Sequence, residues 1–273
     1  MEINSISLLR LGRSARLNRN LLLNLAKRET IGKYKESLFG SLWSILNPLL
    51  MLVIFTFVFT NIFKSRWGVA VDTGSISYGV ILFAGLIVFN LFSECFGKAP
   101  TIVISNQNFV KKIIFPLEIL PIVSMLSALF QACISFAILL VYILIQSGGI
   151  PWTAALLPLG LLPYIFFLLG LMYFLSATGV YIRDIGQTIG IVTTSMMFIS
   201  PIFFPASSFP EHWRFLAYYN PLTYPIEQTR DLLVFGNSID WPIWAMYLLC
   251  SVVFCALGYA WFQKLRAGFA DVL

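Results

Sequence analysis

Charged side chains are scarce in this chain of 273 residues. Asp, Glu, Lys and Arg together make up 11% of the sequence, whereas hydrophobic residues make up 59%. A water-soluble domain needs roughly a quarter of its residues charged, so most of this surface must face lipid. Phe alone contributes 25 residues, which is more than one compact aqueous core could bury. The composition therefore excludes an ordinary soluble enzyme or binding module.

Histidine and cysteine are also rare. The one histidine, His212, stands in a polar segment that we expect to be a surface loop. The four cysteines lie in apolar stretches without a C-x-x-C pair, so we expect buried, reduced thiols that pack as small hydrophobic side chains. The sequence contains no G-x-x-x-x-G-K-S/T phosphate loop and no H-E-x-x-H zinc motif. We therefore expect no catalytic residue, metal site or cofactor in this chain itself.

Long charge-free runs predict six transmembrane helices, because a helix that crosses a bilayer needs about 20 mostly apolar residues. They cover approximately residues 42–62, 78–96, 117–145, 153–181, 187–204 and 241–262. The turn-rich residues 146–151 separate the third helix from the fourth. No internal repeat is visible. The predicted fold class is an all-α membrane protein, with a transmembrane domain over residues 37–273.

The positive charges are concentrated near the N-terminus. Eight of the 18 Lys and Arg precede Ser37. If the N-terminus is inside, only Lys64, Arg66, Arg214 and Arg230 fall on the opposite side of the membrane. Because segments rich in Lys and Arg stay cytoplasmic, both termini are predicted to be cytoplasmic. The net charge of +6 thus indicates contact with an anionic membrane face rather than with nucleic acid.

Two further segments are too polar to span. Residues 1–36 form a predicted interface segment, in which leucines and arginines over residues 5–27 indicate an amphipathic helix lying in the membrane interface. A soluble helix packed on a partner is the alternative interpretation. Residues 205–240 combine aromatic residues with prolines, and we expect short helices there, on the outer face between the fifth and sixth spans.

Four blocks of sequence together resemble one family of membrane proteins. They are RETIGKYKESLFGSLWSILNP (residues 28–48), NQNFVKKIIFP (106–116), VYIRDI (180–185), and SPIFFP with YNPLT (200–205 and 219–223). Their order and spacing resemble ABC-2-type permeases that export O-antigen, capsular polysaccharide or teichoic acid, in particular the Wzm-like permeases. The family commonly has Asp in place of Glu29 and Gln in place of Asn47, and both differences are mild.

The resemblance implies a permease in the bacterial inner membrane that forms a homodimer, each copy bound to a cytoplasmic Wzt-like ABC ATPase. ATP and Mg would be bound by that ATPase, and the implied cargo is a glycan linked to undecaprenyl pyrophosphate. The loop after the second span would dock on the ATPase, and the next cytoplasmic loop would either contact it or pair internally. The residues assigned to this coupling are Asn106, Asn108, Lys111, Lys112, Arg183 and Asp184.

Basic residues before the first span would meet the negative charge of the lipid-linked pyrophosphate at the cytoplasmic interface. The candidates for this headgroup contact are Arg28, Lys33, Tyr34 and Lys35. Plain anchoring of the chain by its positive charge is an equally open interpretation.

Aromatic rings suit a sugar conduit, because the C–H faces of sugars stack on them without strong directional bonds. The resemblance implicates the first and fifth spans as channel walls and the proline-rich segment beyond the fifth as an outer gate, although an inert cap would fit too. The candidate lining residues are Trp43, Phe55, Phe59, Phe63, Phe198, Phe203 and Phe204. Of these, three recur every fourth residue in the first span and share one helix face. Contact with lipid or a neighbouring helix is the alternative for each.

Three other functions stay open. A teichoic acid or small-molecule exporter of the same superfamily would have a similar sequence. An intramembrane transferase acting on lipid-linked sugars would need acidic side chains clustered at one membrane face, where only Glu94, Glu118 and Asp184 come close. A structural scaffold would not require the coupling-loop sequence.

Overall fold

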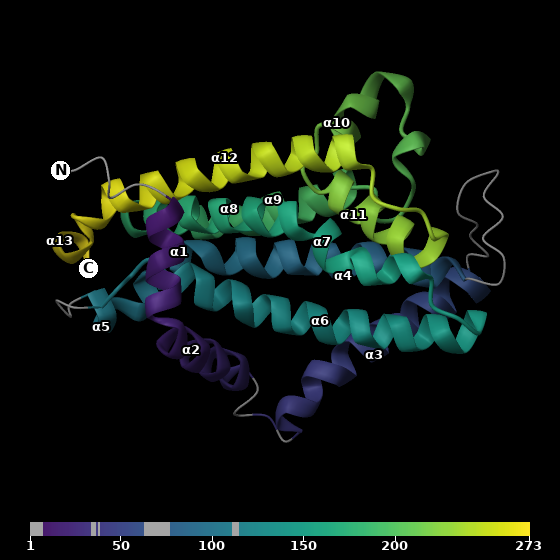
Figure 1. The fold of residues 1–273 in the computed structure, drawn as a ribbon, viewed down its shortest axis with the longest axis horizontal. Coiled ribbons are helices and arrows are strands. Elements are labelled where there is room, and N and C mark those ends of the chain that lie inside the picture. Colours follow the sequence, from purple (N-terminus) through teal and green to yellow (C-terminus); the bar gives the residue numbers. More distant parts are fainter. Residues whose placement is uncertain (1–7, 34–36, 38, 63–76, 111–114) are drawn as a thin grey trace.

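The computed structural model describes residues 8–33, 37, 39–62, 77–110 and 115–273. Helices dominate this part of the chain, and none of its residues lies in a β-strand. The longest helices run side by side (Figure 1) and are α4 (Tyr78–Lys98), α6 (Ile119–Ser147), α8 (Leu162–Tyr181) and α12 (Trp241–Arg266). The others are α1 (Leu8–Leu17), α2 (Arg19–Gly32), α3 (Trp43–Phe57), α5 (Gln107–Val110), α7 (Leu157–Gly160), α9 (Ile185–Ile199), α10 (Arg214–Tyr218), α11 (Thr223–Arg230) and α13 (Phe269–Val272). The all-α prediction is confirmed for the described residues.

Five helical segments are long and apolar enough to cross a membrane, and each corresponds to one predicted span. They are Gly40–Phe57, Tyr78–Thr101, Ile119–Ser147, Trp152–Tyr181 and Trp241–Arg266. In the first, a π-helical turn extends α3 beyond its last residue. In the fourth, a short 3-10 turn and α7 precede α8. A multi-pass membrane protein follows from these segments.

The fifth predicted span, residues 187–204, differs from the structure. Helix α9 has 15 residues, which gives a length of about 22 Å against the roughly 30 Å hydrocarbon core of a bilayer. The residue before a proline avoids helical geometry, and Ser200, just before Pro201, is extended with φ −79° and ψ 149°. The chain therefore leaves the helix at Ile199, and the sixth membrane crossing stays a prediction.

The N-terminal segment forms two helices instead of the single helix expected over residues 5–27. Helices α1 and α2 meet at Asn18, whose side-chain amide donates to a carbonyl one turn earlier at 2.9 Å. Such a bond competes with the regular helix ladder. The apolar face of α2 packs on α6, where Leu22 and Ala26 are buried against Val123. Packing on another helix of the same chain thus holds α2, and a position in the membrane interface stays a prediction.

The two ends of the bundle differ. One end carries α1, α2, α5 and α13, and we call it the base (Figure 1). The other end carries α10 and α11 within the segment 200–240, and we call it the tip. The first and last helices of the chain therefore lie at the same end, the base.

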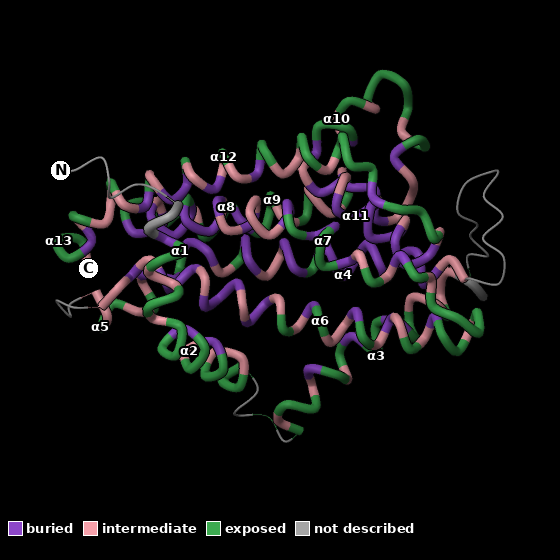
Figure 2. Tube along the Cα trace, viewed as in Figure 1, coloured by how far each residue is buried: buried purple, intermediate pink, exposed green. Residues whose placement is uncertain are grey.

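Helix α4 is the centre of the bundle. It packs against α3, α6, α8, α9 and α11, and buried residues follow most of its length (Figure 2). The pair α8 and α12 is packed most closely, because Gly258 faces Gly170 and a Cβ added at Gly258 would lie 3.0 Å from the Gly170 carbonyl carbon. Small residues allow such close approach of two helix backbones. In contrast, Ile189 is the one buried residue along the whole of α9, and α3 buries little of its surface.

Arg230 lies at the tip but is buried rather than exposed in a loop, with 1% of its surface accessible. Its guanidinium donates to Ile81 O at 3.0 Å, to Pro201 O at 2.5 Å and to Ile202 O at 2.7 Å. A buried charge is tolerated only when hydrogen bonds replace its water. These bonds tie α11 both to α4 and to the chain that follows α9.

The rare residues of the sequence fall partly as expected. Cys95 and Cys255 are buried, whereas Cys133 and Cys250 are exposed on the outside of α6 and α12. The expectation of buried thiols is therefore wrong for the latter two. His212 is exposed in a short turn at the tip, in agreement with a surface loop.

Candidate functional site

Four charged side chains from two helices meet near the base. Glu29 lies in the last turn of α2 and Lys33 follows one turn later, just after the helix ends, while Glu94 and Lys98 stand one turn apart on α4, so the two members of each pair point to the same side. Lys98 Nζ lies 3.0 Å from Glu29 Oε1 and 3.6 Å from Glu94 Oε1. Lys33 forms an ion pair with Glu94. We call these residues the four-charge cluster, and its charges cancel.

Hydroxyl groups of α6 complete the cluster. Ser124 Oγ donates to Glu29 Oε2 at 3.1 Å, and Thr30 Oγ1 donates to Ser127 Oγ at 3.1 Å. Three helices are therefore joined by polar contacts at this point. Lys33, a predicted headgroup contact, is occupied by Glu94, so an anion would have to displace that carboxylate to reach it.

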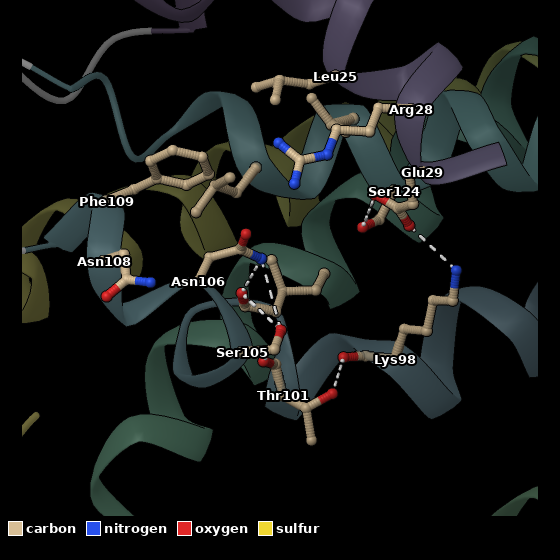
Figure 3. A pocket seen from close by; sticks show the side chains of 13 residues that line it. Leu25, Arg28, Glu29, Lys98, Thr101, Ser105, Asn106, Asn108, Phe109 and Ser124 are labelled. Atoms are coloured by element: carbon tan, nitrogen blue, oxygen red, sulfur yellow. Dashed lines mark hydrogen bonds and ion pairs between the residues drawn. The ribbon is translucent and has the colours of Figure 1, made fainter. Parts of the chain in front are cut away.

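A groove of about 720 Å³ opens beside the four-charge cluster (Figure 3). Its walls are α2, the end of α4, the segment that follows it as far as α5, and the first turns of α6. Figure 3 shows the Arg28 side chain projecting from α2 into the space above Asn106. Asn108 lines the same groove. A predicted headgroup residue and two predicted coupling residues, about 80 positions apart in the chain, thus share one site.

The polar groups of the groove differ in how they are engaged. Asn106 Nδ2 donates to Ile102 O at 2.9 Å, so this amide shapes the turn before α5. Arg28 and Asn108 are exposed, and neither side chain has an ion-pair or hydrogen-bond partner within the described ranges. The guanidinium and the amide are therefore available to a ligand or a partner protein. The predicted site residues Tyr34, Lys35, Phe63, Lys111 and Lys112 lie outside the described residues.

Arg183 and Asp184 occupy the turn between α8 and α9 and are exposed. No ion pair joins them in the part of the chain that the structure describes. Gly179, one turn earlier, packs against the backbone of Pro100 at the end of α4. The turn therefore lies at the base, next to the segment that forms the groove, but it does not line the groove.

Helix α9 exposes polar side chains although its sequence is apolar overall. Gln187, Thr188, Thr194 and Ser195 are exposed, and the two threonines donate to carbonyls of their own helix at 2.9 Å. Polar groups of a membrane helix face protein or water rather than lipid. We call this surface, on which Ile191 is also exposed, the polar face of α9. Sequence reasoning missed it, although the run 193–195, Thr-Thr-Ser, within a charge-free stretch was a visible signal.

Two of the predicted lining residues at the tip end of α9 lie together. Phe198 is 60% exposed, and its ring stacks on that of Phe203 with centroids 6.2 Å apart. Phe204 packs against Phe209 in an edge-on geometry at 5.0 Å. Phe198 is thus the member of this group that is most open to a ligand or a partner.

Two predicted lining residues, Phe55 of α3 and Phe59 of the π-helical turn that follows it, face the bundle more than its outside. Phe55 and Phe59 are half-buried against the core, and the Phe59 ring stacks on Tyr78 of α4 with centroids 5.5 Å apart. Trp43 is half-buried and contacts Phe39 edge-on at 5.9 Å. The positions of Phe55 and Phe59 favour contact with a neighbouring helix, the alternative left open above, whereas the contact of Trp43 with Phe39 decides neither way.

Glu118, a further carboxylate near the base, is engaged in an ion pair. Glu118 Oε2 lies 2.5 Å from Arg266 Nη1, and its other oxygen accepts from Ser14 Oγ at 3.0 Å. Within the described ranges, no three His, Cys, Asp or Glu side chains gather closely enough to hold a metal ion.

Comparison with known proteins places the chain among transporters. Residues 20–234 match the family described as ABC-2 type transporter. The chain is 25% identical over 256 residues to the O-antigen export system permease protein RfbA of Klebsiella pneumoniae, covering 93% of this chain and 95% of that protein. It is 26% identical over 201 residues to RfbA of Myxococcus xanthus, covering 74% of each. It is 27% identical over 232 residues to the polysialic acid transport protein KpsM of Escherichia coli, covering 82% of this chain and 85% of KpsM.

Proposed function

Because the chain belongs to the ABC-2 type transporter family, we propose that it is the permease subunit of an ATP-driven exporter of polysaccharide. The observation that carries this proposal is the alignment of 93% of the chain with a protein named for O-antigen export. The five apolar helices supply the membrane domain that a permease needs. Transport is the role of this chain, and ATP hydrolysis belongs to a separate nucleotide-binding subunit.

The base is the cytoplasmic end in this proposal, and the membrane is the bacterial inner membrane. Helices α1, α2, α5 and α13 lie there (Figure 1), and most Lys and Arg residues belong to segments that end at the base. Helix α9 completes six crossings with help from the turns that follow it. Both chain termini are then cytoplasmic, as the distribution of positive charge predicts.

The groove at the base is the docking site for the ATPase. Arg28 and Asn108 are exposed in the groove and have no partner among the described residues, so they can bond to an acidic or polar surface. The turn with Arg183 and Asp184 adds a second contact at the same end. Lys111 and Lys112 come directly after α5 in the sequence, and in this proposal they take part in the same docking. ATP and Mg²⁺ are held by the ATPase, and movement of the docked segment is passed to α4 and α6.

The cargo is a glycan linked to undecaprenyl pyrophosphate, and the conduit is formed with a second copy of the chain. The polar face of α9 would be costly against lipid, and a homodimer that places two such faces around a water-filled path removes this cost. Phe198 and its stacked neighbour Phe203 offer rings on which sugars can slide. Arg28 lies where a pyrophosphate at the inner membrane surface could reach it.

A transferase receives no support from the contacts at the base, because Glu94 and Glu118 are both occupied in ion pairs. The relative named for polysialic acid transport supports capsular polysaccharide as a second class of cargo. The O-antigen and capsule alternatives share the mechanism above and differ in the glycan alone.

Complementation with co-purification tests the proposed function. The gene is deleted, surface glycan is followed, and the tagged chain is purified in detergent with the ATPase encoded beside it. We expect the wild-type chain to restore surface glycan and to retain ATPase activity. Arg28→Glu should release the ATPase, whereas Lys27→Glu, the neighbouring exposed charge outside the groove, should retain it.

If the double variant Lys111→Glu with Lys112→Glu loses glycan export, these two lysines also belong to the docking site. If the wild-type chain neither restores glycan nor binds any ATPase, the exporter function is wrong. If both charge reversals release the ATPase equally, the groove is not the docking site.

A further inference from the structure

A second hollow lies between α3, α4 and α6, on the other side of the four-charge cluster from the groove. It measures about 400 Å³, and we call it the crevice. Its polar lining consists of Asn47, Asn90, Glu94, Gln131 and Ser135, and its apolar lining includes Phe83, Ile87 and Met51. Each of the three helices belongs to a membrane-spanning segment, so these polar groups stand inside the membrane domain.

Two of the polar groups have no partner in the described chain. The side-chain amides of Asn47 and Asn90 are exposed and make no hydrogen bond to any described residue. Asn90 lies two turns inside α4, about 12 Å along the axis from Lys98. An amide at that depth is expensive to leave unbonded, and intramembrane polar residues mark functional positions for that reason. In contrast, Gln131 Nε2 donates to Ser44 O at 2.8 Å and so braces α3 against α6.

The charge of the crevice selects a neutral ligand. Glu94 is its one ionised lining residue, and this carboxylate is neutralised by Lys33 and Lys98. A free anion would meet the Glu94 carboxylate, and a free cation would compete with two lysines already in place. An uncharged polar molecule faces neither penalty.

The chemistry of the lining selects among neutral ligands. A side-chain amide offers both donors and acceptors, and so does a sugar hydroxyl. Phe83, Ile87 and Met51 provide an apolar wall for the C–H face of a sugar ring. Ligand sites measure roughly 300–1,000 Å³, so the crevice suits one or two sugar rings rather than a long chain segment.

We propose that the crevice between α3, α4 and α6 is a carbohydrate-binding site, in which Asn47 and Asn90 bond sugar hydroxyls. This inference rests on the proposed function, which brings a glycan to the membrane domain. Glu94 lines the crevice and also belongs to the four-charge cluster, and it lies one helix turn from Asn90 on α4. Sugar in the crevice and a partner in the groove would therefore act on the same ion pairs from opposite sides.

Thiol protection in the full permease–ATPase complex tests the site. The exposed cysteines are removed as Cys133→Ser and Cys250→Ser, since Cys95 and Cys255 are buried. Ser135→Cys then places a thiol in the crevice at a lining residue to which the proposal assigns no bond with sugar. The probe ligand is an oligosaccharide of one or two repeat units cut from the bacterium's own surface glycan. We expect a charged maleimide to label the new thiol, and saturating oligosaccharide to slow the labelling at least fivefold.

A chain that retains Cys133 as its one exposed thiol is the matched control, because Cys133 lies on α6 outside the crevice. Oligosaccharide should leave its labelling rate unchanged. Labelling of Ser135→Cys without protection would mean a water-filled hollow with no affinity for sugar, and no labelling would mean that a second copy or lipid covers it. Either result overturns the proposal.

The double variant Asn47→Leu with Asn90→Leu adds a direct measurement of affinity. We expect it to bind the oligosaccharide at least tenfold more weakly while it still retains the ATPase, which shows that it is folded. Unchanged affinity overturns the assignment of these two amides. Export by the unlabelled Ser135→Cys chain separates the two proposals: if glycan reaches the surface but no protection occurs, the crevice inference alone fails.

Discussion

Replacement of Arg230 by methionine tests whether a buried charge holds the tip together. The variant Arg230→Met keeps the length of the side chain and removes its donors. The carbonyls of Pro201 and Ile202, which receive bonds of 2.5 and 2.7 Å, lie outside any helix and would lose this partner. A buried polar group left unbonded costs about 1–3 kcal/mol.

Two such groups give a loss of about 2–6 kcal/mol, and removal of the buried charge returns part of it. We therefore expect Arg230→Met to lower the free energy of unfolding by about 3 kcal/mol, which corresponds to a Tm roughly 6–12 °C lower. The Tm of Arg230→Lys should lie between those of wild type and Arg230→Met. A lysine retains the charge, but its ammonium group cannot bond three carbonyls as the planar guanidinium does. Thermal unfolding of the detergent-purified chain, followed by size-exclusion chromatography, measures the shift.

Arg214→Met is the matched control in the same segment, because the Arg214 guanidinium makes a single long bond of 3.4 Å to Ser207 O. We expect its Tm to stay within about 2 °C of wild type, as for most surface substitutions. If the Tm of Arg230→Met changes as little as that of this control, the three carbonyls do not depend on the guanidinium, and the reasoning from burial is wrong.

Three further predictions follow from other contacts. Gly258→Leu should separate α8 from α12, because even a Cβ at this position would press on the backbone of Gly170. We expect the variant to lose its monodisperse peak on size-exclusion chromatography, and a normal profile would contradict this. Burial raises the pKa of the Glu227 carboxyl at the tip above its usual value, so its stabilising contribution is present at low pH and is lost as pH rises through the raised pKa. Glu227→Gln should therefore be more stable than wild type at pH 8 but not at pH 4, and equal melting curves at pH 8 would refute this. Lys98→Met should free Glu29 and speed hydrogen exchange in α2 with a change of about 1 kcal/mol or less in overall stability; unchanged exchange would show that the ion pair does not hold α2.

The membrane spans were predictable because they depend on local composition. Whether a charge-free run is long enough to cross a bilayer can be read directly from the sequence. The segments Tyr78–Thr101 and Trp241–Arg266 accordingly correspond closely to the predicted spans 78–96 and 241–262. The end of the fifth span was misplaced although its cause is local too. Pro201 ends α9 at Ile199, and a reading by hydropathy alone passes over a proline in an apolar run.

Long-range contacts could not be predicted from the sequence. Arg230 was counted as an outer charge, and only the carbonyls of distant residues such as Ile81 make its burial possible. In the same way, Arg28 and Asn108 were assigned separate roles, and the packing of α2 on α6 brings them to one groove. The crevice could not be predicted for a further reason. Asn90 is a single polar residue in a long apolar run, and only the fold shows that it lines the same hollow as Asn47.

The close contact of Gly170 with Gly258 has a mechanical consequence. Two backbones in contact cannot slide or tilt without breaking many packed atoms at once, so α8 and α12 behave as a stiff beam. Helices α3 and α9, which bury little of their surface, have few contacts to break and are the compliant parts of the molecule. A force applied at the base therefore displaces α3 and α9, while α8 and α12 stay in place. Stiffness on one side and compliance on the other direct a displacement at the base to α3 and α9.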